Sequence, residues 1–133
     1  YELYEELILP FSKKILNSVK EMNCPNIFFP KDFSLGLKSI NKGICDFVSI
    51  DWHISLNSAR YLVDESVGVQ GNMDPRILYY DKNDIENYLN SCIEFGSKNN
   101  NWIFNLGHGF LPDIDYKKAQ FVVDWIKKTN WNR

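Results

Sequence analysis

Four short runs rich in β-branched and aromatic residues constrain the fold of this chain more than any other sequence feature. They are Ile27–Phe29, Phe47–Ile50, Val67–Val69 and Trp102–Phe104. The runs are largely continuous and do not alternate with polar residues, which is typical of strands buried on both faces. The sequence therefore predicts four parallel strands with helices covering the sheet.

The segments between these runs carry apolar residues at helical spacing. A helical pattern precedes the first run and stops near Asn23–Pro25, with apolar positions at Leu3, Leu7, Phe11, Ile15 and Val19. A short helix with Phe33, Leu37 and Ile40 is predicted to end at Gly43, a favourable C-terminal cap. Another short helix is predicted from Ser55 to Val63.

The later connections carry clearer helix signals. Asp74–Pro75 predicts an N-cap followed by proline at the first helical position. A further helix is predicted from about Asp81 to Gly96, with one face made of Ile85, Tyr88, Leu89 and Cys92. After the last run, Pro112 and Asp113 lead into a terminal helix with three inward residues, Phe121, Val122 and Trp125.

Strands and helices therefore alternate, which implies a parallel sheet with right-handed crossovers. Two α/β architectures fit this order, an open doubly wound sheet or half of a (β/α)8 barrel. A whole barrel needs roughly 250 residues. The 133 residues of this chain supply about half of one. Because the chain begins at Tyr1 and not at Met, we expect it to be a piece of a longer protein.

Composition excludes several classes of function. The net charge is -2 and the basic residues are scattered, which does not favour nucleic acid as a partner. No apolar stretch approaches the roughly 20 residues of a membrane span, and no leader is expected. The three cysteines are widely spaced and odd in number, so they predict neither disulfides nor a CxxC metal site and fit a reducing compartment: Cys24, Cys45 and Cys92.

Polar residues and glycines follow every predicted strand, where functional groups of both architectures gather. The sharpest feature is Gly107-His108-Gly109, in which flanking glycines allow a ligand to approach closely. Two interpretations remain open for His108, a ligand-contacting or proton-handling imidazole and a structural turn residue. For His53, a position at the start of a helix or on the surface is favoured over a position at the carboxyl edge of the sheet.

The acidic and amide residues of these loops suit structural duties. We expect Asp51 to hydrogen-bond loop backbone, Asn72 and Asp74 to serve in a turn and a cap, and Asp113 and Asp115 to start the last helix. The sequence contains no phosphate-binding loop and no G-x-S-x-G nucleophile elbow. Two histidines and three scattered cysteines also do not predict a catalytic zinc site.

Four motifs in order resemble the uroporphyrinogen decarboxylase family. They are IFFPKD (Ile27–Asp32), SIDW (Ser49–Trp52), VQGNMDP (Val69–Pro75) and FNLGHGFLP (Phe104–Pro112). The resemblance implies a (β/α)8 barrel, of which residues 1–133 are the C-terminal half and the N-terminal half is absent. It implies stepwise decarboxylation of the four acetate side chains of uroporphyrinogen III, giving coproporphyrinogen III in haem biosynthesis, without metal or organic cofactor.

The resemblance also bears on individual residues. His108 matches the LGHG histidine with which the family contacts its porphyrinogen substrate. The family's aspartate and arginines do not carry over: Asp51 is not assigned to that aspartate, and none of its arginines is matched by Arg60, Arg76 or Arg133. No catalytic residue is therefore assigned here, and we expect the isolated chain to be inactive. The resemblance further implies a homodimer in the cytoplasm, with a plastid-type organelle as the alternative.

Two alternatives remain. One is a methyltransferase of the same superfamily, which acts on a corrinoid or thiol and holds zinc with histidine and cysteine; no His-x-Cys pair occurs here. The other is a non-catalytic half-barrel that serves as an interaction fragment. A half-barrel exposes two strand edges and an apolar face, so it should associate with its missing N-terminal half or with another copy.

Overall fold

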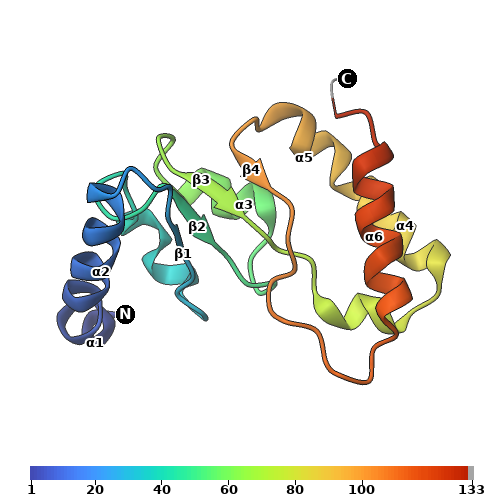
Figure 1. Ribbon diagram of the computed structural model, residues 1–133, viewed down its shortest axis with the longest axis horizontal. Helices are drawn as coiled ribbons and strands as arrows, with labels where there is room; N and C mark the ends of the chain where they lie inside the picture. Colours follow the sequence, from blue (N-terminus) through green and yellow to red (C-terminus); the bar gives the residue numbers. More distant parts are fainter. Residues whose placement is uncertain (132–133) are drawn as a thin grey trace.

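The computed structural model describes residues 1–131 and contains a sheet of four parallel strands (Figure 1). The strands are β1 (Ile27–Phe28), β2 (Phe47–Ser49), β3 (Gly68–Gln70) and β4 (Trp102–Ile103). Their order in the sheet is the order of the sequence. A doubly wound sheet reverses its strand order at a switch point, whereas a (β/α)8 barrel does not. The predicted α/β class and the half-barrel arrangement are confirmed.

Helical segments precede and connect the strands. They are α1 (Glu2–Leu7), α2 (Leu9–Glu21), the 3-10 helix η1 (Ser34–Ser39), α3 (Leu56–Leu62), the 3-10 helix η2 (Pro75–Tyr79), α4 (Lys82–Ser91), α5 (Ile93–Lys98) and α6 (Tyr116–Lys128). Four of them begin at side chains that accept a hydrogen bond from the first-turn backbone: Ser55, Asp74, Asp81 and Asp115. Such caps satisfy N–H groups that have no partner inside the helix, which is why local sequence located these starts correctly.

Two predicted helix ends are wrong. The helix after β1 is a 3-10 helix that ends at Ser39, and Gly43 lies in the following turn, where its N–H donates to Asn41 Oδ1 at 2.9 Å. Gly96 does not end a helix but lies inside α5. A Cβ atom at residue 96 would be 2.6 Å from the Trp131 ring, so packing against a distant residue requires this glycine.

Two clusters of buried side chains form the core. The first joins α2, η1, α3 and the central strands, and includes Leu16, Leu37, Ile40, Val48, Ala59 and Val69. The second joins η2, α4 and α6, and includes Leu78, Ile85, Leu89 and Val122, with Phe121 and Trp125 packed against it. The predicted inward faces of α4 and α6 are therefore confirmed. In Figure 1, α1 and α2 lie on the β1 side and α4–α6 on the β4 side.

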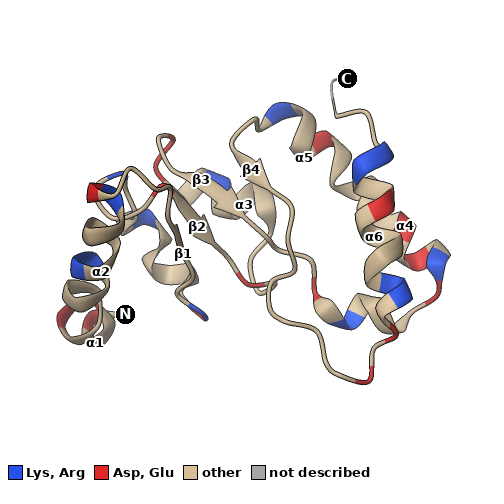
Figure 2. Ribbon diagram, in the orientation of Figure 1, with Lys and Arg blue, Asp and Glu red and all other residues tan. Residues whose placement is uncertain are grey.

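The outer strands and the first helices are more exposed than the apolar pattern predicts. Ile27 in β1 and Ile103 in β4 are 46% and 37% exposed, because each outer strand has a neighbour on one side only. Of the apolar residues at helical spacing before β1, Leu3, Leu7, Phe11 and Ile15 are exposed. Basic and acidic residues are interspersed along the helices (Figure 2). Within residues 1–131, no helix is both long and apolar enough to cross a bilayer.

Candidate functional site

The loops that follow β2, β3 and β4 come together at the carboxyl edge of the sheet, which we call the rim. The loop after β4 is joined to the loop after β3 by a parallel bridge between Met73 and Leu106. In addition, the Gly107 N–H donates to the Met73 carbonyl at 2.8 Å. The chain around His108 is therefore an extension of the sheet and not a free loop.

Gly107 also contacts the loop after β2. A Cβ atom at residue 107 would lie 2.7 Å from the Trp52 backbone nitrogen, so only glycine fits without a shift. This contact places the next residue, His108, beside the Trp52 indole, with ring centroids 6.2 Å apart in an edge arrangement. The imidazole of His108 is exposed, and its Nδ1 lies 3.2 Å from the Gly109 carbonyl oxygen.

Asp51 joins the loops after β1 and β2. Its carboxylate is buried, and it accepts from the backbone N–H of Asp32 at 2.8 Å and from that of His53 at 2.9 Å. The predicted role of Asp51, hydrogen bonding to loop backbone, is confirmed. The imidazole Nδ1 of His53 lies 3.2 Å from both Asp51 Oδ1 and Asp32 Oδ1. His53 thus lies at the rim and is also exposed just before the Ser55 cap of α3, as the predicted surface or helix-start position requires.

Asn72 holds the backbone of the neighbouring loop. It is buried, and its amide Nδ2 donates to the Asp51 carbonyl at 2.8 Å and to the Ile54 carbonyl. Asn72 therefore connects two loops of the rim and does not occupy the turn that the sequence predicts. These bonds satisfy buried carbonyl groups that would otherwise destabilise the fold.

Arg76 lies over Trp52, with its guanidinium carbon 5.8 Å from the ring centroid. The same guanidinium donates to both oxygens of Asp74 at 2.6 to 3.0 Å. Hydrogen bonds from Arg76 hold the pKa of Asp74 below its ordinary value. Three side chains with basic groups thus contact the Trp52 indole: His53, His108 and Arg76.

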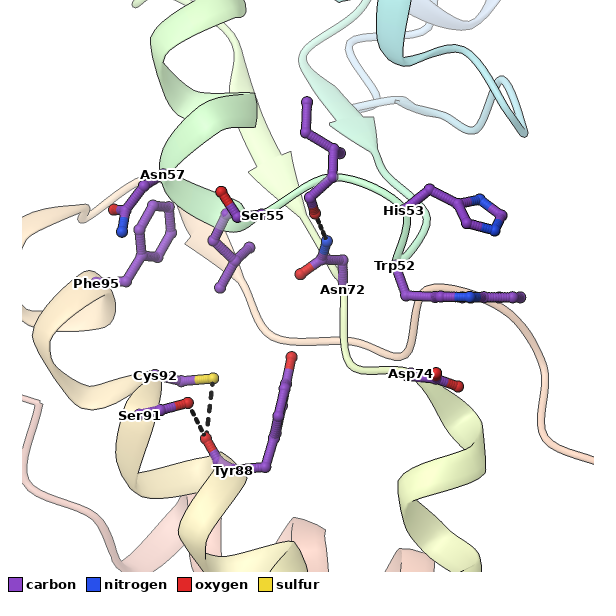
Figure 3. Close-up of a pocket in the computed structure, with 12 residues that line it drawn as sticks. Trp52, His53, Ser55, Asn57, Asn72, Asp74, Tyr88, Ser91, Cys92 and Phe95 are labelled. Atoms are coloured by element: carbon purple, nitrogen blue, oxygen red, sulfur yellow. Dashed lines mark hydrogen bonds between the residues drawn. The ribbon is translucent and has the colours of Figure 1, made fainter.

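A cavity of about 390 Å³ opens beside this group (Figure 3). One wall comes from the rim and includes Trp52 and Asn72, and the other comes from α4 and α5 and includes Tyr88, Cys92 and Phe95. Burial raises the pKa values of the Tyr88 hydroxyl and the Cys92 thiol. Both groups are therefore neutral near pH 7, and this wall carries no nucleophilic thiolate.

Comparison with known proteins decides the family. A family model described as uroporphyrinogen decarboxylase (URO-D) matches residues 1–129. The chain belongs to the uroporphyrinogen decarboxylase family. Uroporphyrinogen decarboxylases of Geobacter metallireducens and Trichlorobacter lovleyi are 34% and 35% identical to it over 125 residues, covering 94% of this chain and 37% of each relative. That of Francisella tularensis subsp. novicida is 37% identical over 130 residues, covering 96% and 38%. The chain thus spans little more than a third of these relatives.

The structure bears on the methyltransferase alternative. In residues 1–131, one group of three potential metal ligands lies with its atoms within 4.8 Å of one another: Asp32, Asp51 and His53. This group contains no cysteine, unlike the zinc site expected of those methyltransferases. Asp51 also accepts from the backbone N–H groups of Asp32 and His53, and the His53 imidazole lies 3.2 Å from the Asp32 carboxylate, so a metal is not needed to explain their proximity.

Other predicted residues of this uroporphyrinogen decarboxylase family member lie in structural positions. Arg60 donates to the carbonyls of Val63 and Val67 at 2.8 and 2.7 Å and thus connects α3 to β3. Asp113 accepts from the Tyr79 hydroxyl, and Asp115 caps α6. Arg133 lies outside the residues that the structure describes. The sequence did not single out Trp52 as a site residue, because a tryptophan next to a strand is more often part of a core. It did not single out Arg76 either, because this arginine matches none of the family's.

Proposed function

We propose that this chain is part of a carboxy-lyase that removes the four acetate carboxylates of uroporphyrinogen III in turn and yields coproporphyrinogen III for haem synthesis. The observation that carries the proposal is the family match over residues 1–129. In this chemistry a protonated pyrrole accepts the electron pair as carbon dioxide leaves, so no metal or organic cofactor is required. The protein must bind a polyanion and stabilise the charge that develops on the ring.

His108 is proposed to contact the substrate. Three observations support this role: the imidazole is exposed, it lies at the carboxyl edge of the sheet, and the contact between Gly107 and Trp52 fixes its loop. Function in (β/α)8 barrels is concentrated at this edge. An imidazole held by a rigid loop can donate to a substrate carboxylate with little loss of side-chain freedom on binding.

We further propose that residues 1–133 form the C-terminal half of a barrel and that another segment supplies the N-terminal half with the catalytic aspartate and arginines. Exposed apolar surfaces at both ends of the sheet support this division. Ile27 and Phe29 are 46% and 41% exposed on the β1 side. On the β4 side, an apolar groove of about 430 Å³ lies between the loop after β4 and α6, lined in part by Phe104, Phe110, Val123 and Ile126.

Two further proposals concern the assembly of the complete protein and its compartment. Exposed apolar surface favours association, and a homodimer is proposed for the complete protein. Cytoplasmic location is proposed because all three cysteines are free thiols, which suits a reducing compartment.

The test is complementation. The chain is incubated with uroporphyrinogen III, alone and mixed with the N-terminal barrel half of a relative, and coproporphyrinogen is followed by chromatography. Product is expected only in the mixture, with a loss of about tenfold or more in kcat/KM for His108→Ala, the effect of one hydrogen bond to a charged group. The control Tyr61→Ala removes an aromatic ring that is 89% exposed on α3 and should retain full activity.

Turnover by the chain alone would contradict the division of catalytic groups. If the mixture forms a stable complex yet makes no product, the decarboxylase proposal fails and the half-barrel interaction fragment is favoured. Full activity of His108→Ala would remove His108 from the substrate site.

A further inference from the structure

The His53 imidazole lies against two carboxylates at the rim. Its Nδ1 lies 3.2 Å from one oxygen of Asp51 and from one oxygen of Asp32. Carboxylate oxygens accept hydrogen bonds, so a ring proton on Nδ1 is favoured beside these two oxygens. The other nitrogen, Nε2, is on the opposite edge of a side chain that is 55% exposed.

The group that holds His53 is itself held firmly. Asp51 is only 3% exposed, and its two oxygens accept from the backbone N–H groups of Asp32 and His53. Asp32 has a φ of 57°, in the left-handed region that few residues other than glycine adopt. The loop after β1 is thus bent so that both the backbone and the carboxylate of Asp32 meet the loop after β2. The Nδ1 edge of the His53 ring therefore lies against a carboxylate that backbone hydrogen bonds hold in place.

His53 and His108 lie beside the same aromatic side chain. Both imidazoles contact Trp52, at centroid distances of 5.1 Å for His53 and 6.2 Å for His108. Arg76 lies over the same indole at 5.8 Å. An aromatic ring bordered by groups that donate to anions suits a ligand with flat aromatic rings and peripheral carboxylates.

We propose that His53 is a second substrate-contacting residue, whose Nε2 hydrogen-bonds a side-chain carboxylate of the porphyrinogen, and that Asp51 is its positioning residue. With Nδ1–H directed at Asp51, Nε2 must take up a proton from solvent when the ligand binds, and the ring then donates to both the Asp51 carboxylate and a carboxylate of the ligand. The inference rests on the proposed function, because that function makes the ligand a polycarboxylate.

The chain has only two histidines, which allows a direct test by nuclear magnetic resonance. The imidazole nitrogens are observed in the 15N-labelled chain and assigned with His53→Ala and His108→Ala. In the free chain, the His53 ring should carry its proton on Nδ1. Asp51→Asn should change that pattern at His53 and leave His108 unaffected, which a purely structural role for Asp51 would not predict. A His53 ring without a proton on Nδ1 would overturn the inference, and this measurement does not depend on a stable Asp51 variant.

Binding is then measured with uroporphyrin I, a stable octacarboxylate, in the presence of a chelator. Saturable shifts of both imidazole signals are expected. His53→Ala should weaken binding about tenfold, the effect of one hydrogen bond to a charged group. Tyr61→Ala, which truncates an exposed ring on α3, should leave the dissociation constant unchanged.

The outcomes separate this inference from the proposed function. If uroporphyrin I shifts only the His108 signal, or if His53→Ala binds as tightly as the parent chain, His53 is not a substrate contact and the decarboxylase proposal is unaffected. If His53 responds while the complemented protein makes no coproporphyrinogen, the carboxylate contact stands and the decarboxylase proposal fails. A His53 response to Zn²⁺ without any response to uroporphyrin I would overturn the inference.

Discussion

Gly107 and Trp52 are in contact across the rim, where a Cβ atom on residue 107 would come within 2.7 Å of the Trp52 backbone nitrogen. The contact joins the loop after β4 to the loop after β2, although β3 lies between these strands in the sheet. It therefore determines where His108 lies relative to Trp52. The geometry of the proposed substrate site depends on the absence of one side chain.

Gly107→Ala should lower the free energy of unfolding by about 1–3 kcal/mol, because the added methyl group forces a backbone shift. It should also weaken uroporphyrin I binding by displacing His108. Urea unfolding and a binding titration check both effects. Gly109→Ala is the matched control, since a Cβ atom there would meet nothing within 4 Å, and its stability should change by less than about 0.5 kcal/mol. Equal effects of the two substitutions would contradict the proposed contact.

Asn72→Leu should destabilise the chain by about 1–3 kcal/mol, because the buried carbonyl of Asp51 and the part-buried carbonyl of Ile54 lose the amide that donates to them. Urea unfolding measures the loss. Asn57→Leu provides the comparison, since Asn57 lines the same cavity but is exposed on α3. If the two variants are equally stable, the bonds made by Asn72 contribute nothing measurable.

Thiol reactivity should distinguish Cys24 from the other two cysteines. Cys24 is exposed, whereas Cys45 and Cys92 are buried. Burial raises the pKa of Cys45 to about 11 and also raises that of Cys92, so neither forms much of the reactive thiolate at pH 8. Ellman's reagent should modify one thiol rapidly in the native chain and all three in denaturing urea. Cys24→Ser should abolish the rapid reaction, and a rapid reaction that remains in this variant would contradict the assigned burial.

Asp46 should contribute stability that depends on pH. A hydrogen bond from Lys42 and one from the Asn26 backbone hold the pKa of Asp46 below its ordinary value. The folded chain therefore favours the ionised form of Asp46, and the ionised carboxylate in turn stabilises the fold. Its contribution is complete above the unfolded-state pKa of about 3.9 and is lost as the pH falls through the lower pKa of the folded state.

Asp46→Asn should accordingly be less stable than the parent chain at pH 7 and pH 5, and the difference should shrink near pH 3. Urea unfolding at the three pH values measures it. Glu86→Gln, which removes an exposed carboxylate on α4, should show no such dependence. A stability difference for Asp46→Asn that is as large at pH 3 as at pH 7 would refute the assignment.

The sequence by itself determined the features that depend on neighbouring residues. Caps at Ser55, Asp74 and Asp81 located helix starts because a cap bonds to backbone N–H groups two or three residues away. The succession of apolar runs and helical spacings gave the α/β class and the parallel sheet. The ordered motifs identified the family and pointed to His108, without any knowledge of its neighbours.

Tertiary structure alone decided the features that depend on residues far apart in the chain. Gly96 lies inside α5 and leaves room for the Trp131 ring, although a glycine near a helix end locally favours termination. The rim position of His53 depends on Asp32, which reaches it from the loop after a different strand. Whether an apolar residue is buried is also decided at this level. Phe11 and Ile15 have the helical spacing of a core face, yet they are exposed, because spacing specifies a face of a helix and not the surface against which it packs.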